Sequence, residues 1–355
     1  MVYLDYAATM PLLGSARKAM HEAEERFFAN ASALHTPGHL AMNEIEACRA
    51  LLAELINAEI DEIIFTSGAS EANNTVIRTF EGCKIETSPL EHHSILETTK
   101  EYSGTNNPKL YSYMLANNET GEFLKLPKKK SGEYLHSDLT QAFGKIPIDV
   151  KALDLDYATL SAHKIGGPVG VGALYIKRDA PFKAFIIGGN QEKKRRGGTY
   201  NTVGIAGFRA ALENLKKHKI WETYDTKVRD LRDTLAQRIL REISGSSLNT
   251  DIKKGKSLPN ILNVSFEAAE GESIQLYLDA EGIIVSTGSA CASGDIKPSH
   301  VLMAKTGDAE IAHSSIRFSF GPDNTMADVE YVMSVLPSII KRLQAISTIE
   351  RKDKK

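Results

Sequence analysis

The chain has 355 residues, a length that suits a two-domain enzyme better than one small domain. Apolar residues make up 42% of it, and a net charge of −2 gives no electrostatic reason to expect nucleic acid as a partner. No apolar run approaches the roughly 20 residues that span a bilayer, and the N-terminus lacks the features of a signal peptide. Cys48, Cys83 and Cys291 are spaced for neither a disulfide framework nor a zinc site, so we expect a cytoplasmic protein without membrane contact.

Short apolar runs alternate with helical stretches over the first two thirds of the chain, which is typical of a mostly parallel sheet with crossover helices. Seven strands are predicted for this sheet, at residues 62–66, 84–87, 110–116, 133–136, 157–160, 173–176 and 185–187. Residues 204–243 then have the apolar spacing of one long helix.

The last third has a different pattern, which predicts a smaller α+β unit. Its expected strands and helices are residues 261–266, 283–286 and 315–320, and residues 272–281 and 326–346. We therefore expect an α/β enzyme with a large domain over residues 12–225 and a small domain formed by residues 1–11 and 226–355.

Two motifs at predicted strand ends suit a phosphate and a reactive amine. Residues 65–74 (FTSGASEANN) open a helix with small hydroxyl residues, and free N–H groups there would cradle an anion. A helix cap with a tight turn explains this segment equally well. Lys164 follows another strand, beside Ser161 and His163, where a lysine can form a Schiff base with a carbonyl cofactor. The alternative is an ordinary surface lysine.

Further strand ends supply polar groups for a flat ring. Asp138 can pair with a protonated pyridine nitrogen, and Gln141 can reach the ring's phenolic oxygen, although capping of the next helix is the simpler explanation for Asp138. His92 of the Glu-His-His-Ser motif offers an imidazole that can stack and move protons, but paired histidines more often reflect packing. Residues 117–121 (NNETG) are by themselves only a good turn.

The last third contributes a thiol and an arginine. Cys291 lies within residues 286–294 (STGSACASG), a composition that suits a flexible loop with an accessible nucleophile better than a buried core strand. Arg317 lies inside a predicted strand, where it can clamp a carboxylate through two hydrogen bonds or simply face solvent.

Together, in this order, these motifs resemble the cysteine desulfurases, a branch of the class V aminotransferase family with the fold-type-I pyridoxal-phosphate architecture. The resemblance runs from residues 3–9 (YLDYAAT) to the C-terminal helix, nearly the whole chain. It implies that Lys164 carries pyridoxal 5′-phosphate as a Schiff base and that Asp138 pairs with the pyridine nitrogen. The other implied cofactor contacts are made by Asn118, Gln141, His92, Ala69, Ser70, Ser161, His163 and Thr199.

The resemblance also implies the substrate, the reaction and the partners. Arg317, assisted by Asn30, would bind the carboxylate of L-cysteine, and Lys164 would remove its α-proton. Cys291 would attack the substrate sulfur and keep it as a persulfide, leaving alanine. A homodimer follows because Thr199 would serve the partner's phosphate, and the sulfur would pass to an acceptor protein for iron–sulfur assembly or tRNA thiolation.

Three departures from the family pattern stand out. The segment between Asn118 and Asp138 is short, which predicts a trimmed crossover helix; Glu192-Lys193-Lys194 replaces Glu-Arg-Gly; and Asn30-Ala31-Ser32 replaces Asn-Pro-Ser. The alternatives are a selenocysteine lyase, a class V aminotransferase or a non-catalytic scaffold that binds the cofactor. Cys291 favours the desulfurase over the first two, and the joint presence of Lys164, Asp138, His92, Arg317 and Cys291 disfavours the scaffold.

Overall fold

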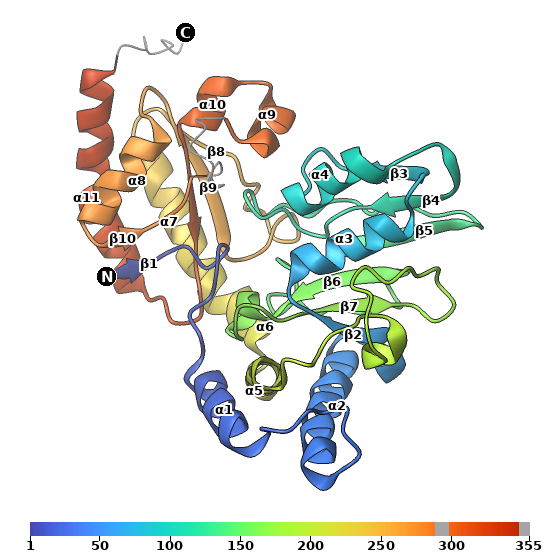
Figure 1. The fold of residues 1–355 in the computed structure, drawn as a ribbon. Coiled ribbons are helices and arrows are strands. Elements are labelled where there is room, and N and C mark those ends of the chain that lie inside the picture. Colours follow the sequence, from blue (N-terminus) through green and yellow to red (C-terminus); the bar gives the residue numbers. More distant parts are fainter. Residues whose placement is uncertain (288–297, 348–355) are drawn as a thin grey trace. The chain divides into compact units, whose positions relative to one another are not determined.

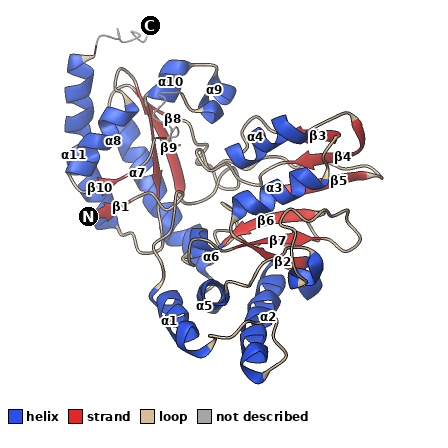
Figure 2. Cartoon of the chain, viewed as in Figure 1, coloured by secondary structure: helices blue, strands red, loops and turns tan. Residues whose placement is uncertain are grey.

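The computed structural model describes residues 1–287 and 298–347, so Cys291 lies outside the described residues (Figures 1 and 2). The chain forms two compact units. The small unit comprises Met1–Ala8, Ala116–Phe123 and Glu222–Lys355, and the large unit comprises Thr9–Leu115 and Leu124–Trp221. This division differs from the expected domains at residues 9–11, 116–123 and 222–225, where short segments change sides.

The large unit is built on one six-stranded sheet, and the expected α/β class with a mostly parallel sheet is confirmed. The strand order is β2-β7-β6-β5-β4-β3. Strands β3 to β6 are parallel neighbours, whereas β7 runs antiparallel to both β6 and β2, so β2 points the same way as β3 to β6. The strands are β2 (Ile63–Thr66), β3 (Cys83–Thr87), β4 (Asn106–Ser112), β5 (Glu133–Asp138), β6 (Tyr157–Ser161) and β7 (Gly172–Ile176).

One of the seven predicted strands is not part of this sheet. Residues 185–187 lie outside the strand ladders: Gly197 N donates to Ile186 O (2.9 Å), and the Phe185 ring contacts the Arg78 guanidinium at 4.6 Å. Ile187 is 87% exposed, so this apolar run is not a buried strand. The strand predicted at residues 110–116 is real but lies four residues earlier, as β4.

Helices cover the sheet because their apolar stripes match the buried strands. Every residue of β6 and β7 is buried, and Val76 and Ile77 of α3 and the following Phe80 belong to the same core cluster as Leu174 of β7. Helix α5 packs against α1 and α2 (Figure 1). The helices of the large unit are α1 (Gly14–Arg26), α2 (Thr36–Ile56), α3 (Ala69–Thr79), α4 (His93–Tyr102) and α5 (Thr202–His218).

The connection from β4 to β5 has no crossover helix, as the short segment predicted. Residues 113–132 contain only isolated bridges, Ala116 with Phe123 and Glu122 with Ser257. Parallel neighbours are usually joined by a helix. Here the chain instead leaves the large unit at residue 115 and returns at residue 124, after eight residues that belong to the small unit.

The long helix predicted over residues 204–243 is interrupted, so this prediction was wrong. Helix α5 ends at Lys219, whose φ of 43° is left-handed and whose N–H bonds to the carbonyls of Leu215 and Lys216. The chain continues through α6 (Ile220–Thr223), a π-turn at residues 224–228 and α7 (Arg229–Glu242). A lysine at this position gives no composition signal for a helix end, which explains the error.

The small unit has the predicted α+β composition. Strands β8 (Ser246–Leu248), β9 (Ile261–Phe266) and β11 (Ser315–Ser319) form an antiparallel sheet in the order β11-β9-β8, and β1 (Val2–Tyr3) pairs with β10 (Ile283–Ile284). Its helices are α7, α8 (Gly271–Ala280), α9 (His300–Thr306), α10 (Ala309–His313) and α11 (Met326–Ile346). The helix predicted at residues 326–346 is confirmed residue for residue and begins with a capping box of Thr325 and Asp328. Over the described residues, none of the helices combines the length and hydropathy that crossing a membrane requires.

Candidate functional site

The strand directions bring the predicted motifs of the large unit to one edge of its sheet. Since β2, β3, β5 and β6 point the same way, their carboxyl ends share that edge. Ser70, His92, Asp138 and Lys164 each lie at or just after one of these ends. In open α/β sheets this is the edge where ligands bind.

Asp138 is joined to His92 by a continuous chain of hydrogen bonds. The Asn73 amide nitrogen donates to Asp138 Oδ2 (2.8 Å) and to Ser94 Oγ (2.9 Å), which uses both of its hydrogens. Ser94 Oγ lies 2.8 Å from His92 Nδ1. Since the Ser94 N–H also donates to Nδ1 (3.1 Å), this nitrogen is an acceptor, and the proton of the neutral ring is on Nε2.

Asp138 is held rigidly within this chain. It is buried, and its second oxygen, Oδ1, accepts the Thr140 N–H at 2.9 Å. Two residues earlier on β5, the His136 ring is fully buried between Ser112 Oγ (2.8 Å) and Thr159 Oγ1 (3.0 Å). Burial lowers the pKa of His136 to about 4, although the negative charge of Asp138 opposes this, so the ring is neutral. The groups described around Asp138, namely Asn73, the Thr140 N–H and the His136 ring, are therefore neutral.

Lys164 lies in a 3₁₀ turn, Ala162–Ile165, directly after β6. The N-terminal segment of the large unit fixes this turn: Met10 N donates to His163 O, and Leu13 N donates to Gly166 O, both at 3.0 Å. His163 Nδ1 lies 3.1 Å from Thr9 Oγ1. Burial, followed by the positive charges of the nearby lysines, lowers the pKa of His163 to about 4. His163 thus provides a neutral hydrogen-bonding ring beside the lysine.

The start of α3, where the motif predicted an anion cradle, has no side-chain cap. Gly68 precedes the helix without any side-chain cap, and Ala69 and Ser70 are its first residues. An alanine at Gly172 would place its Cβ 2.7 Å from the Gly68 backbone, so β7 closes tightly against this turn. The first N–H groups of a helix without a side-chain cap favour an anion.

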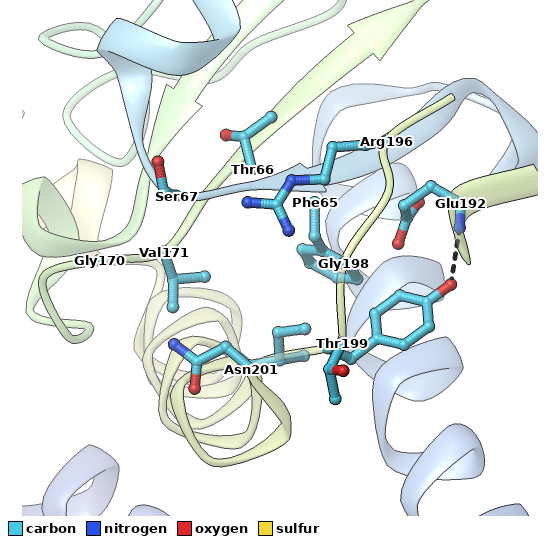
Figure 3. A pocket seen from close by; sticks show the side chains of 12 residues that line it. Phe65, Thr66, Ser67, Gly170, Val171, Glu192, Arg196, Gly198, Thr199 and Asn201 are labelled. Atoms are coloured by element: carbon cyan, nitrogen blue, oxygen red, sulfur yellow. Dashed lines mark hydrogen bonds between the residues drawn. The ribbon is translucent and has the colours of Figure 1, made fainter. Parts of the chain in front are cut away.

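A pocket of about 160 Å³ lies beside this cradle (Figure 3). Thr66 and Ser67 form one wall, and Thr199 lies at the opposite wall. The Arg196 guanidinium forms two hydrogen bonds with Glu71, at 2.9 and 3.2 Å. Burial opposes ionisation of Glu71, but the bonds from Arg196 and Ser67 hold its pKa below the ordinary value. Thr199 is exposed at the pocket.

The small unit contains a separate group around Arg317. Its Nη2 donates to Asp5 Oδ1 (2.8 Å), and its Nη1 donates to the Asn118 carbonyl (2.9 Å). The side chain is buried, and its Nε has no hydrogen-bond partner among the described residues. An arginine oriented by a carboxylate, with a donor still available, can bind another anion.

The ends of the undescribed segment that contains Cys291 are attached to this group. Before the gap, Ser286 pairs with Arg317 through two backbone hydrogen bonds, at 2.7 and 3.2 Å. After it, the Ser299 hydroxyl donates to Glu119. Burial raises the pKa of Glu119 to about 7, against the effects of the Ser299 bond and the Arg317 charge.

Asn30 makes a local contact, whereas Asn118 contacts a residue far along the chain. Asn30 Oδ1 accepts the Ser32 N–H (2.9 Å) in the α1–α2 loop. Asn118 contacts Arg317 through its backbone. Gln141 and Ser161 are both buried, and each lies three residues from Asp138 or Lys164 in the sequence. Their predicted contacts with the cofactor stay predictions.

Sequence reasoning missed the roles of Asn73, Ser94 and Asp5. All three lie inside segments that the motifs already contained, but their partners are up to 312 residues away. Asn73 is fully buried in a helix and such a side chain needs partners, but its burial is visible only in the structure. Among the described residues, no cluster of three or more His, Cys, Asp or Glu side chains could hold a metal ion.

Comparison with known proteins agrees with this geometry. The family model described as "Aminotransferase class-V" matches residues 2–109 and 100–332. A protein named cysteine desulfurase IscS from Dictyoglomus turgidum is 40% identical, over 98% of this chain and 96% of its own length. A cysteine desulfurase from Gluconacetobacter diazotrophicus is 39% identical over 98% and 95%.

Among solved structures, a NifS-like protein from Rickettsia africae superposes with a TM-score of 0.87 at 30% identity, covering 96% of this chain and 99% of that one. The likeness thus extends over both units and not only over the sheet that carries Lys164. The chain therefore belongs to the aminotransferase class-V family, in its cysteine desulfurase branch.

Proposed function

We propose that this protein is a pyridoxal-phosphate-dependent cysteine desulfurase, which converts L-cysteine to L-alanine and keeps the sulfur as a persulfide on Cys291. The observation that carries the proposal is the meeting of Lys164 and the hydrogen-bonded Asp138 at one edge of the sheet. The names of the full-length relatives support the same activity.

The residues of the large unit fit the cofactor. Asp138 is a buried carboxylate whose two oxygens are oriented by neutral donors, which suits pairing with a protonated ring nitrogen. The uncapped start of α3 suits the phosphate, and Lys164 supplies the amine for covalent attachment. Asn73 Oδ1 is buried without a hydrogen-bond partner among the described residues, as expected where a polar ligand belongs. When bound, pyridoxal phosphate supplies an electron sink for charge that develops at the substrate Cα.

Protons in the reaction are handled by the chain's own side chains. The Lys164 amine can accept the proton from the substrate Cα. His92, with Nδ1 occupied as an acceptor, presents Nε2–H as a hydrogen-bond donor. Because its orientation depends on Ser94 and Asn73, the His92 ring and Asp138 are positioned by one network.

In the sulfur transfer, one bond to the substrate sulfur forms and one breaks. The Cys291 thiolate attacks the sulfur of L-cysteine, so an S–S bond forms while the Cβ–S bond breaks. The electron pair left on the substrate carbon takes a proton, which gives alanine and the Cys291 persulfide. Arg317, oriented by Asp5, binds the substrate carboxylate with the assistance of Asn30.

The remaining parts of the proposal concern assembly and partners. We propose a cytoplasmic homodimer in which Thr199 completes the partner subunit's phosphate site, with Gln141 and Asn118 at the ring oxygen and Ser161 at the phosphate. Thr199 is exposed at its pocket, which supports this. The persulfide sulfur passes to an acceptor protein, a scaffold or carrier for iron–sulfur assembly or tRNA thiolation.

Mass spectrometry of the Cys291 peptide tests the proposed reaction. Cofactor-loaded protein is incubated with L-cysteine without reductant, and we expect one added sulfur on that peptide and an equal amount of alanine. The Lys164→Ala variant should produce neither. Alanine without the persulfide would indicate the lyase reaction instead, and no product even with an added sulfur acceptor would indicate a scaffold.

A further inference from the structure

Lys145 is a buried lysine that contacts the turn carrying Lys164. It is 1% exposed, and its Nζ donates to the backbone carbonyl of Lys164 at 2.6 Å. The preceding Gly144 has a φ of +82°, and a Cβ there would lie 2.6 Å from the Ile165 side chain. The backbone at Gly144 therefore packs so closely against the turn that there is no room for a side chain at this position.

The surroundings of Lys145 are unusual for a buried ammonium group. Over the described residues, the ionisable groups that act on it or share its contacts are Lys164 and His163, both basic, and no carboxylate is among them. Burial, followed by the charge of Lys164, lowers the pKa of Lys145 to about 7. A buried charge without a counterion is costly, so a neutral donor would hold the same carbonyl at a smaller cost in stability. The hydrogen bond to the carbonyl therefore does not by itself explain why this residue is a lysine.

We propose that Lys145 is a positioning residue for Lys164: Lys145 holds the carbonyl of the turn, and when it is protonated its positive charge disfavours protonation of the Lys164 amine. The inference rests on the proposed function, in which Lys164 acts through that amine. Repulsion between like charges is mutual. Because the charge of Lys164 makes Lys145 harder to protonate, the charge of Lys145 makes Lys164 harder to protonate by the same amount. An amine activated in this way by a neighbouring cation can act as a nucleophile or base near neutral pH.

Two substitutions separate the charge from the hydrogen bond. Lys145→Gln keeps a donor for the Lys164 carbonyl but removes the charge, and Lys145→Met removes both. Lys109→Met is the matched control, since Lys109 is another lysine of the large unit but pairs with Glu86 at 2.7 Å. The glutamine variant is the one expected to fold best, because the carbonyl keeps its partner.

The first readout is the pH titration of the bound cofactor's absorption spectrum, measured without substrate. We expect the midpoint to rise by about one pH unit in both Lys145 variants and to stay unchanged in Lys109→Met. A wild-type midpoint in folded Lys145→Gln would overturn the proposal, because the hydrogen bond alone would then explain the residue.

The second readout needs no cofactor and follows the stability of the apo-protein against pH. The pKa of Lys145 is lower in the folded state than in the unfolded state. Between about pH 7 and pH 10, therefore, Lys145 is protonated only in the unfolded state. As pH rises from about 7 to 10, the free energy of unfolding of the wild type should therefore increase relative to that of Lys145→Gln. Equal profiles would overturn the inference alone, whereas wild-type protein that takes up no cofactor on Lys164 would overturn the proposed function and this inference with it.

Discussion

The two units hold their functional groups in different ways. In the large unit, Asp138 and His92 are oriented by neutral amide and hydroxyl groups, and the imidazoles of His136 and His163 are kept uncharged by burial. In the small unit, Arg317 is oriented by direct contact with the Asp5 carboxylate.

This difference matches what each group has to recognise. Neutral hydrogen bonds are directional, so they suit the fixed geometry of a planar ring and its proton donors. Charge-assisted hydrogen bonds are stronger than neutral ones, so they supply binding energy for a small charged substrate. Mutations should accordingly affect orientation in the large unit and affinity in the small unit, and four predictions test this.

The largest effect is expected at Arg317. Arg317→Gln removes the proposed carboxylate clamp and leaves the half-buried Asp5 without its ion-pair partner. We therefore expect kcat/KM for L-cysteine to fall about a hundredfold to a thousandfold and stability by about 2 kcal/mol. Asp5→Asn keeps an acceptor for the guanidinium and should cost only about tenfold, mostly in KM. Steady-state alanine formation measures both. Equal kcat/KM for Arg317→Gln and wild type would exclude Arg317 from substrate binding.

The next effect concerns Asn73. Asn73→Ala removes both donors that link Asp138 to Ser94, which should lower kcat by about tenfold or more and destabilise the fold by about 1–3 kcal/mol. Asn74→Ala is the control, since the neighbouring amide bonds only to the Ser70 carbonyl of its own helix. Denaturant melts and kcat values check the pair. If both variants lose kcat equally, the network has no special role.

A pH-dependent effect is expected at Glu119. Its folded pKa of about 7 lies above the unfolded value, so the folded state binds the extra proton and stability falls as pH rises from about 4.5 to 7. The loss is at most about 3 kcal/mol. Glu119→Gln should flatten this part of the stability profile, measured by thermal melts between pH 4 and 8. An unchanged slope would mean that Glu119 is ionised in the folded protein.

The smallest effect is expected at Thr199. Thr199→Ala removes one proposed phosphate contact and should weaken cofactor binding by about tenfold or less. Mixed dimers sharpen the test: a Thr199→Ala subunit paired with a Lys164→Ala subunit should have one complete site if the threonine serves its partner. Cofactor affinity in the mixture reports this. No recovery over the Thr199→Ala homodimer would place the contact within a single subunit.

Much of the fold and the site was predictable because it depends on local sequence. Strand ends with small or charged residues led to the predicted site residues Ser70, Asp138 and Lys164, which the structure places at one edge of the sheet. The helix at residues 326–346 was found from its spacing alone. The break at Lys219 was not predicted, because a left-handed lysine is stabilised by its context and not by its residue type. The predicted strand at residues 185–187 failed for a similar reason, since an apolar run does not reveal whether a neighbour is there to pair with it.

The supporting contacts could not be predicted. Asn73 reaches Asp138 across 65 positions, and Asp5 reaches Arg317 across 312. Such pairs depend on how the strands are ordered, which motifs do not encode. Cys291 remains a prediction, because it lies outside the described residues.

The antiparallel strand β7 also has a consequence for folding. It directly follows β6 in the chain, so the turn that carries Lys164 closes by a short-range contact, which generally forms early. The phosphate cradle after β2 reaches that turn only when Ile64 pairs with Leu174, far along the chain. The proposed cofactor would need both parts, so it would bind only after this late pairing. We therefore expect it to slow unfolding of the finished sheet more than it accelerates folding.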